Sequence, residues 1–154
     1  MKNKRLLVIF LCICLAFIWG NSCLPVARSR APSEALLRWL RGLFGSAPAQ
    51  EGNALLNSHS IRKLAHFAEF AVLGVLAYLI IRSCVQTRER RMLMLILFGF
   101  AVALIDETIQ CFSDRGPRIP DVWLDCSGFA AGCLTAWFLI RKKHRRKYGR
   151  SLAI

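Results

Sequence analysis

The sequence predicts an all-α membrane protein: a bundle of about four transmembrane helices, with an amphipathic interfacial helix after the first. Three observations predict this fold. The 154 residues are 55% hydrophobic. Their apolar residues form unbroken stretches of about 18 residues, which is long enough to cross the hydrocarbon of a bilayer. The net charge of +13 sits mainly at the ends of those stretches. A chain of this length is expected to form one domain, here residues 1–154.

The apolar stretches place the expected spanning helices over residues 6–22, 64–82, 92–110 and 122–140, followed by a basic tail over residues 141–154. The first stretch follows a short basic segment, which is also typical of a signal peptide. A cleavage site there would be poor, because Pro25-Val26-Ala27 is a weak small-x-small sequence. We therefore favour a retained helix.

The segment after the first span predicts a short helix that lies flat on the membrane surface. Pro32-Ser33-Glu34 supplies a cap and an acidic first turn. Apolar residues then recur on one face: Leu36, Leu37, Leu40, Leu43 and Phe44. Trp39 suits the level of the lipid headgroups. We expect this amphipathic helix on the outer leaflet.

The basic residues predict the orientation of the chain. Of the 22 lysines and arginines, three precede the first span, four lie between the second and third, and seven follow the fourth. The positive-inside rule then places both termini in the cytoplasm. We interpret the run from Arg141 to Lys147 as a topology signal that touches anionic membrane lipids. We expect no nucleic-acid partner.

Seven cysteines raise the question of a disulfide framework or a metal site. Six of them lie within or beside the apolar stretches, and no C-x-x-C pair occurs. We therefore interpret them as small apolar residues. The spacing of a zinc site is missing, so we assign no metal ligands and leave the cofactor open.

Polar residues near the ends of the second, third and fourth spans form the candidate site, because ionisable groups in spanning helices are costly and indicate a role. They are Arg62, Lys63, His66, Glu69, Asp106, Glu107, Gln110, Arg115, Arg118, Asp121 and Asp125. The second span enters from outside, the third leaves there and the fourth re-enters there, so we expect one cluster at the outer interface. Gly128 and Gly132 would let two helices approach closely around it.

Simpler interpretations are open for single members of this cluster. Asp121 could cap the fourth span, Arg62 and Lys63 could reach to the interface from their helix, and His66 could be a packing residue. The convergence of three helices favours a site.

The composition of the cluster suits several kinds of chemistry. Its cationic members, which suit a lipid-linked phosphate or peptide headgroup, are Arg62, Lys63, Arg115 and Arg118. For catalysis the candidates are His66, Glu69, Asp106 and Glu107, because a carboxylate beside an imidazole can form an acid/base pair. The carboxylates could instead hold Mg²⁺ or Ca²⁺.

Ordered motifs in the cluster carry a resemblance to a known family. They are Arg62-Lys63-x-x-His66-Phe67-x-Glu69-Phe70-x-x-Leu73-Gly74, Asp106-Glu107-x-x-Gln110 and Arg118-x-x-Asp121-x-x-x-Asp125-x-x-Gly128, with Asn21-Ser22, Pro25, Ser29 and Ser33 before them. Over residues 15–140 the chain resembles the VanZ-like family of bacterial membrane proteins. The resemblance implies a four-helix protein of the bacterial cytoplasmic membrane, whose namesake is associated with resistance to the glycopeptide teicoplanin.

Three functions follow as hypotheses. The first is a protein that binds a lipid-linked cell-wall precursor or a glycopeptide, and so modulates sensitivity to teicoplanin-type antibiotics. The second is an intramembrane enzyme that acts on a lipid-linked phosphate or peptide. The third is a small transporter component, which would need an oligomer to form a pore. The oligomeric state is left open.

Overall fold

The computed structural model describes residues 2–23, 58–112 and 119–151, and within these ranges all regular structure is α-helical. The elements are α1 (Lys2–Ser22), α3 (Ser58–Cys84), α4 (Arg88–Phe112) and α5 (Ile119–Ser151). Each contains an apolar segment long enough to cross a membrane, of 19, 25, 25 and 24 residues respectively. The predicted all-α membrane fold is therefore confirmed. The amphipathic helix expected around Trp39 lies outside the described residues.

The helices begin earlier and end later than the apolar stretches alone indicated. The second begins at Ser58 rather than near Leu64, and the fourth continues to Ser151, through most of the predicted basic tail. Arginine, lysine and glutamate favour helix almost as strongly as leucine. The apolar stretch shows which part of a helix can lie in lipid. The helix itself extends further, because the charged residues that flank the stretch also favour helix.

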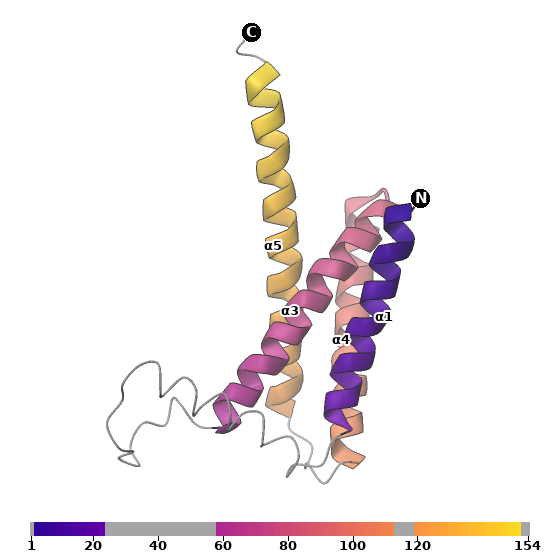
Figure 1. Ribbon diagram of the computed structural model, residues 1–154, viewed down its shortest axis with the longest axis vertical. Coiled ribbons are helices and arrows are strands. Elements are labelled where there is room, and N and C mark those ends of the chain that lie inside the picture. Colours follow the sequence, from indigo (N-terminus) through magenta and orange to yellow (C-terminus); the bar gives the residue numbers. More distant parts are fainter. Residues whose placement is uncertain (1, 24–57, 113–118, 152–154) are drawn as a thin grey trace, which may run out of the picture.

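Successive helices run in opposite directions (Figure 1). Helices α1 and α4 lie side by side, and α3 crosses in front of α5 in this view. The start of α1 meets the end of α3, where the Lys4 ammonium donates to the Ser83 carbonyl oxygen at 3.0 Å. Both chain termini therefore lie toward one end of the bundle, and the polar ends of α3, α4 and α5 lie at the other.

The crossing of α3 and α5 is the most extensive contact between helices, and glycines make it possible. A Cβ atom at Gly128 would meet the carbonyl of Phe67, and one at Gly132 would meet the carbonyl of Ala71. The two backbones therefore approach closely at both positions, as the four-residue spacing predicts. Next to this contact, the rings of Phe98 and Phe129 lie 6.1 Å apart and fasten α4 to α5.

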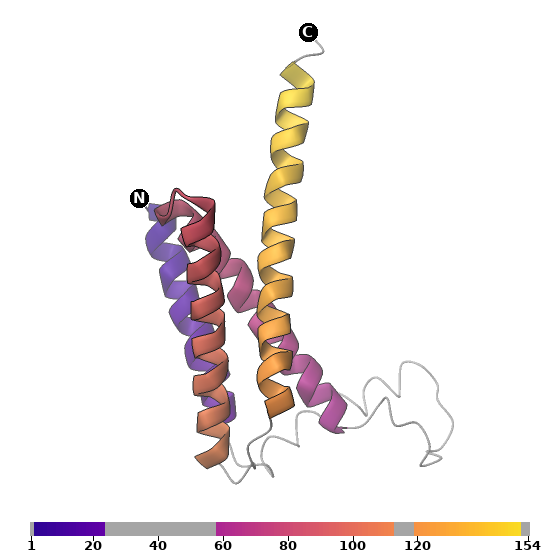
Figure 2. The ribbon, with the colours of Figure 1, turned by 180° about the vertical axis from the view of Figure 1, so that it is seen from behind.

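A small apolar core fills the space between the helices and includes Ile18, Phe70, Leu73 and Ala103, each wholly buried. Large apolar side chains also cover the outside of the bundle: Leu64, Ile96 and Leu134 are all more than 60% exposed. In water such a surface would be unfavourable, but in a bilayer it faces hydrocarbon. The C-terminal half of α5 stands apart from the other helices in both views (Figures 1 and 2).

Candidate functional site

The fold gathers polar side chains from all four described helices at the end of the bundle away from the termini. The cluster was predicted from α3, α4 and α5, and the end of α1 joins it. Its centre is Asp106 of α4, whose side chain is completely buried. The Ser22 hydroxyl donates to Asp106 Oδ1 at 2.7 Å, and Gln110 Nε2 donates to Oδ2 at 2.6 Å. Two neutral donors, one on α1 and one a turn further along α4, therefore solvate this carboxylate in place of water.

A second carboxylate, Glu69 of α3, lies beside this centre and also has a partner on α1. Asn21 Nδ2 donates to Glu69 Oε1 at 3.1 Å. His66 faces both acids: its Nδ1 lies 3.8 Å from Glu69 Oε2 and 4.0 Å from Asp106 Oδ2. These two separations are longer than hydrogen bonds. His66 and Glu69 lie three residues apart on the same side of α3, and the histidine is within electrostatic reach of two carboxylates.

A third carboxylate, Asp121, lies in the first turn of α5. Its Oδ1 is 2.7 Å from Lys63 Nζ, and this ion pair joins the start of α3 to the start of α5. Since α5 begins at Ile119, Asp121 lies inside the helix, and its side chain is engaged by a neighbouring helix. Interhelical pairing, rather than capping alone, accounts for its position.

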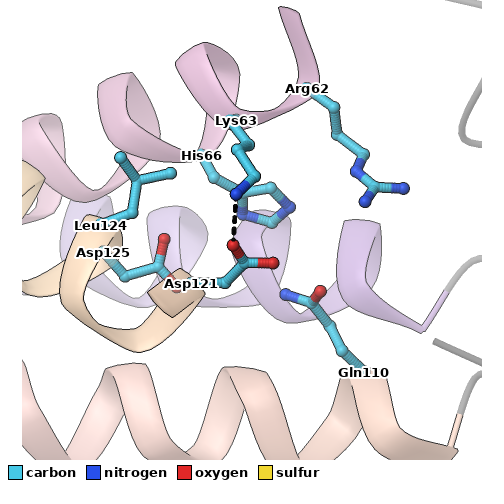
Figure 3. A pocket seen from close by; sticks show the side chains of 7 residues that line it. All are labelled: Arg62, Lys63, His66, Gln110, Asp121, Leu124 and Asp125. Carbon is cyan, nitrogen blue, oxygen red and sulfur yellow. Dashed lines mark ion pairs between the residues drawn. The ribbon is translucent and has the colours of Figure 1, made fainter. Parts of the chain in front are cut away.

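A small pocket opens beside these groups, and we call it the charged pocket (Figure 3). Its lining residues are Arg62, Lys63, His66, Gln110, Asp121, Leu124 and Asp125. The ion pair between Lys63 and Asp121 crosses its middle, with Arg62 to one side and Asp125 to the other. Six of the seven lining residues belong to the set predicted from the sequence.

A family model described as VanZ/LLP1 matches residues 6–141 of the chain. The chain belongs to the VanZ/LLP1 family. The match covers α3 and α4 completely, α1 from residue 6 onward, and α5 as far as residue 141. No curated protein and no solved structure matches the chain.

Among the described residues of this VanZ/LLP1 protein, three predicted site residues do not line the charged pocket: Glu69, Asp106 and Glu107. Glu107 is buried on α4, with 8% of its surface exposed, and it follows Asp106 directly. Arg115 and Arg118 lie outside the described residues. Within the part of the chain that is described, Arg62 and Lys63 are therefore the cations beside the five carboxylates of the cluster.

Asn21 and Ser22 are the residues whose part in the site the sequence did not reveal. In the sequence they match the VanZ-like pattern, but nothing there links them to the polar cluster. Their partners lie 48 and 84 residues further along the chain, and no local periodicity connects them. One feature of the sequence could have pointed to their role: they are two adjacent polar residues at the end of a long apolar stretch.

The seven cysteines of the VanZ/LLP1 chain are all free thiols. Cys133 illustrates their role: its Sγ lies between helices and donates to the Gly74 carbonyl oxygen at 3.4 Å. Among the described residues, no group of three or more histidine, cysteine, aspartate or glutamate side chains is arranged to hold a metal ion. Three carboxylates of the cluster, Glu69, Asp106 and Asp121, are each turned to a different partner.

Proposed function

We propose that this VanZ/LLP1 protein binds the anionic headgroup of a lipid-linked envelope component in the charged pocket. The observation that carries this proposal is Arg62. Its guanidinium borders the pocket, and no ion pair or hydrogen bond joins it to another described residue. A guanidinium held at the end of a membrane-spanning bundle matches the geometry and the depth of a phosphate group.

The proposal places the protein in the bacterial cytoplasmic membrane, with both termini in the cytoplasm and the charged pocket outside. Two observations support it: the termini lie toward one end of the bundle, and most basic residues of the sequence belong to that end. A pocket on the outer side would meet wall precursors after their export. By occupying or presenting such a precursor, the protein would alter sensitivity to glycopeptides of the teicoplanin type.

Two natural cysteines test the orientation. Cys84 ends α3 near the termini and Cys111 lies in the last turn of α4 near the pocket, and both are exposed. In intact cells, a membrane-impermeant maleimide is expected to label a variant that keeps only Cys111 and to spare one that keeps only Cys84. Both variants should label after permeabilisation, which controls for reactivity. Labelling of Cys84 alone in intact cells would reverse the proposed orientation.

Binding itself is tested with Arg62→Ala. Loss of a charge-assisted contact is expected to weaken binding of phosphatidylglycerol by about tenfold, measured by native mass spectrometry of the purified full chain. Arg88→Ala is the matched control, since Arg88 is an exposed arginine at the other end of the bundle. In cells that lack the native gene, only the Arg62 variant should fail to restore native teicoplanin sensitivity. Equal effects of the two substitutions would contradict a role of the pocket.

A second candidate function, an enzyme, is favoured by the position of His66. This residue lines the pocket and faces Glu69 and Asp106, an arrangement that could move a proton to or from a bound headgroup. Incubation of the purified protein with envelope lipids, with and without divalent ions, separates the two functions. Turnover that His66→Gln abolishes would establish the enzyme, and unchanged lipids would leave binding as the function.

A further inference from the structure

Two ionisable groups of opposite type lie on the two sides of the charged pocket, and no ion pair joins them. On one side is the guanidinium of Arg62, and on the other is the carboxyl group of Asp125 (Figure 3). Resting on the binding function proposed above, we infer that the pocket takes a headgroup that contains both a phosphate and a primary ammonium. The phosphate lies against Arg62 and the ammonium against Asp125.

Asp125 is the observation that points to a cation in the ligand. It is 2% exposed, it lines the pocket, and no hydrogen bond or ion pair joins its side chain to another described residue. A buried carboxylate without a partner is unfavourable, and a ligand that supplies hydrogen-bond donors would remove that cost. The asparagine, serine and glutamine of the site donate to Glu69 and Asp106 instead.

The electrostatic surroundings of Asp125 favour a positive group. The carboxylates of Asp106, Glu107, Asp121 and Glu69 all interact repulsively with it. The lysine among the lining residues, Lys63, is paired with Asp121 at 2.7 Å. Among the described residues, a positive ligand group placed beside Asp125 therefore meets more carboxyl groups than cations.

The arrangement fits an ammonium better than a divalent metal ion. Mg²⁺ and Ca²⁺ need several oxygen ligands around one point, and the described acidic side chains form no such group. A primary ammonium needs fewer partners, because its three N–H donors can reach acceptors in different directions. A quaternary ammonium has no donor and would leave Asp125 without a hydrogen bond.

The fixed pair in the middle of the pocket gives the ligand a direction. The contact between Lys63 and Asp121 lies between Arg62 and Asp125 in Figure 3. A bound headgroup would therefore extend across this pair, with its negative part on the Arg62 side and its positive part on the Asp125 side. A purely anionic headgroup could satisfy only one side.

The experiment compares three phospholipids with identical acyl chains by native mass spectrometry of the full-length protein: phosphatidylethanolamine, phosphatidylglycerol and phosphatidylcholine. The native protein is expected to bind phosphatidylethanolamine about tenfold more tightly than the other two, the usual scale of one charge-assisted hydrogen-bonded contact. In Asp125→Asn this preference should disappear while binding of phosphatidylglycerol is unchanged or tighter. The control Glu89→Gln, at an exposed position in the first turn of α4, should retain the preference.

The outcomes separate this inference from the function on which it rests. Equal binding of the three lipids by the native protein, or a preference that survives in Asp125→Asn, would overturn the inference. If Arg62→Ala still weakens lipid binding in either case, the proposed binding function stands and only the preference for an ammonium headgroup is lost. If Arg62→Ala weakens the binding of none of the three lipids, the proposed function and this inference are both wrong. Competition by free phosphoethanolamine identifies the source of the headgroup: displacement of the lipid shows that the soluble headgroup suffices, and no displacement shows that the acyl chains are also required.

Discussion

Gly132→Ala is expected to lower the stability of the protein by about 3 kcal/mol or more, the upper range for overpacking a closely fitted interface. The added Cβ would meet the carbonyl and Cα of Ala71. These are backbone atoms of α3, so no flexible side chain can move aside. Thermal unfolding in detergent, followed by circular dichroism, measures the effect.

Gly20→Ala is the matched control for this substitution. It makes the same chemical change within a helix, but no atom lies within 4 Å of the added Cβ. Alanine is preferred over glycine inside helices by about 0.5–1 kcal/mol, so this variant should unfold at the native temperature or slightly above it. Similar losses in both variants would show that the crossing of α3 and α5 is not as close as described.

Asp106→Leu is the second substitution expected to have a large effect. It removes the acceptor of both Ser22 and Gln110 in a wholly buried position. Each donor left unpaired costs about 1–3 kcal/mol, so the thermal midpoint should fall clearly below that of the native protein. Asp106→Asn should stay close to native, because the new carbonyl can accept from Ser22 while Gln110 turns its amide to accept from the new NH₂ group.

The two Asp106 variants also separate the contribution of this residue to protein stability from the contribution of its negative charge to lipid binding. A folded Asp106→Asn protein that no longer binds lipid would show that the negative charge itself matters to the site. Native stability in Asp106→Leu would contradict the hydrogen-bond network, because it would mean that neither donor depends on this carboxylate.

The sequence was sufficient to predict the four described helices, and six of the polar residues that it singled out line the charged pocket. Length and apolar character determine a membrane span almost alone, since a bilayer accepts few other structures. The antiparallel order of the spans then placed Lys63, Asp106 and Asp121 at one end. Gln110 lies four residues after Asp106 on α4, and this spacing agrees with their contact at 2.6 Å.

The partners within the cluster could not be predicted in this way. By sequence spacing, the polar face of α3 includes Arg62, His66 and Glu69 but not Lys63. This spacing gave no reason to expect that Lys63, rather than Arg62, pairs with Asp121. That choice depends on the crossing angle of α3 and α5. The donors on α1 were missed for a similar reason, because helix contacts between distant segments leave no periodic signal in a single sequence.

The continuation of α5 beyond the apolar span changes what its positive charges can reach. The span ends at Lys143, and the helix runs straight on to Ser151, a rigid rod that rises about 1.5 Å per residue. Ionic screening limits electrostatic attraction to about 8 Å in physiological salt. A disordered tail could fold back onto an anionic membrane, but a straight helix carries its backbone about 12 Å along its axis beyond Lys143, which exceeds that range. The last turn of α5 therefore ends beyond the reach of the membrane's surface charge, and only the turns just after the span lie within it.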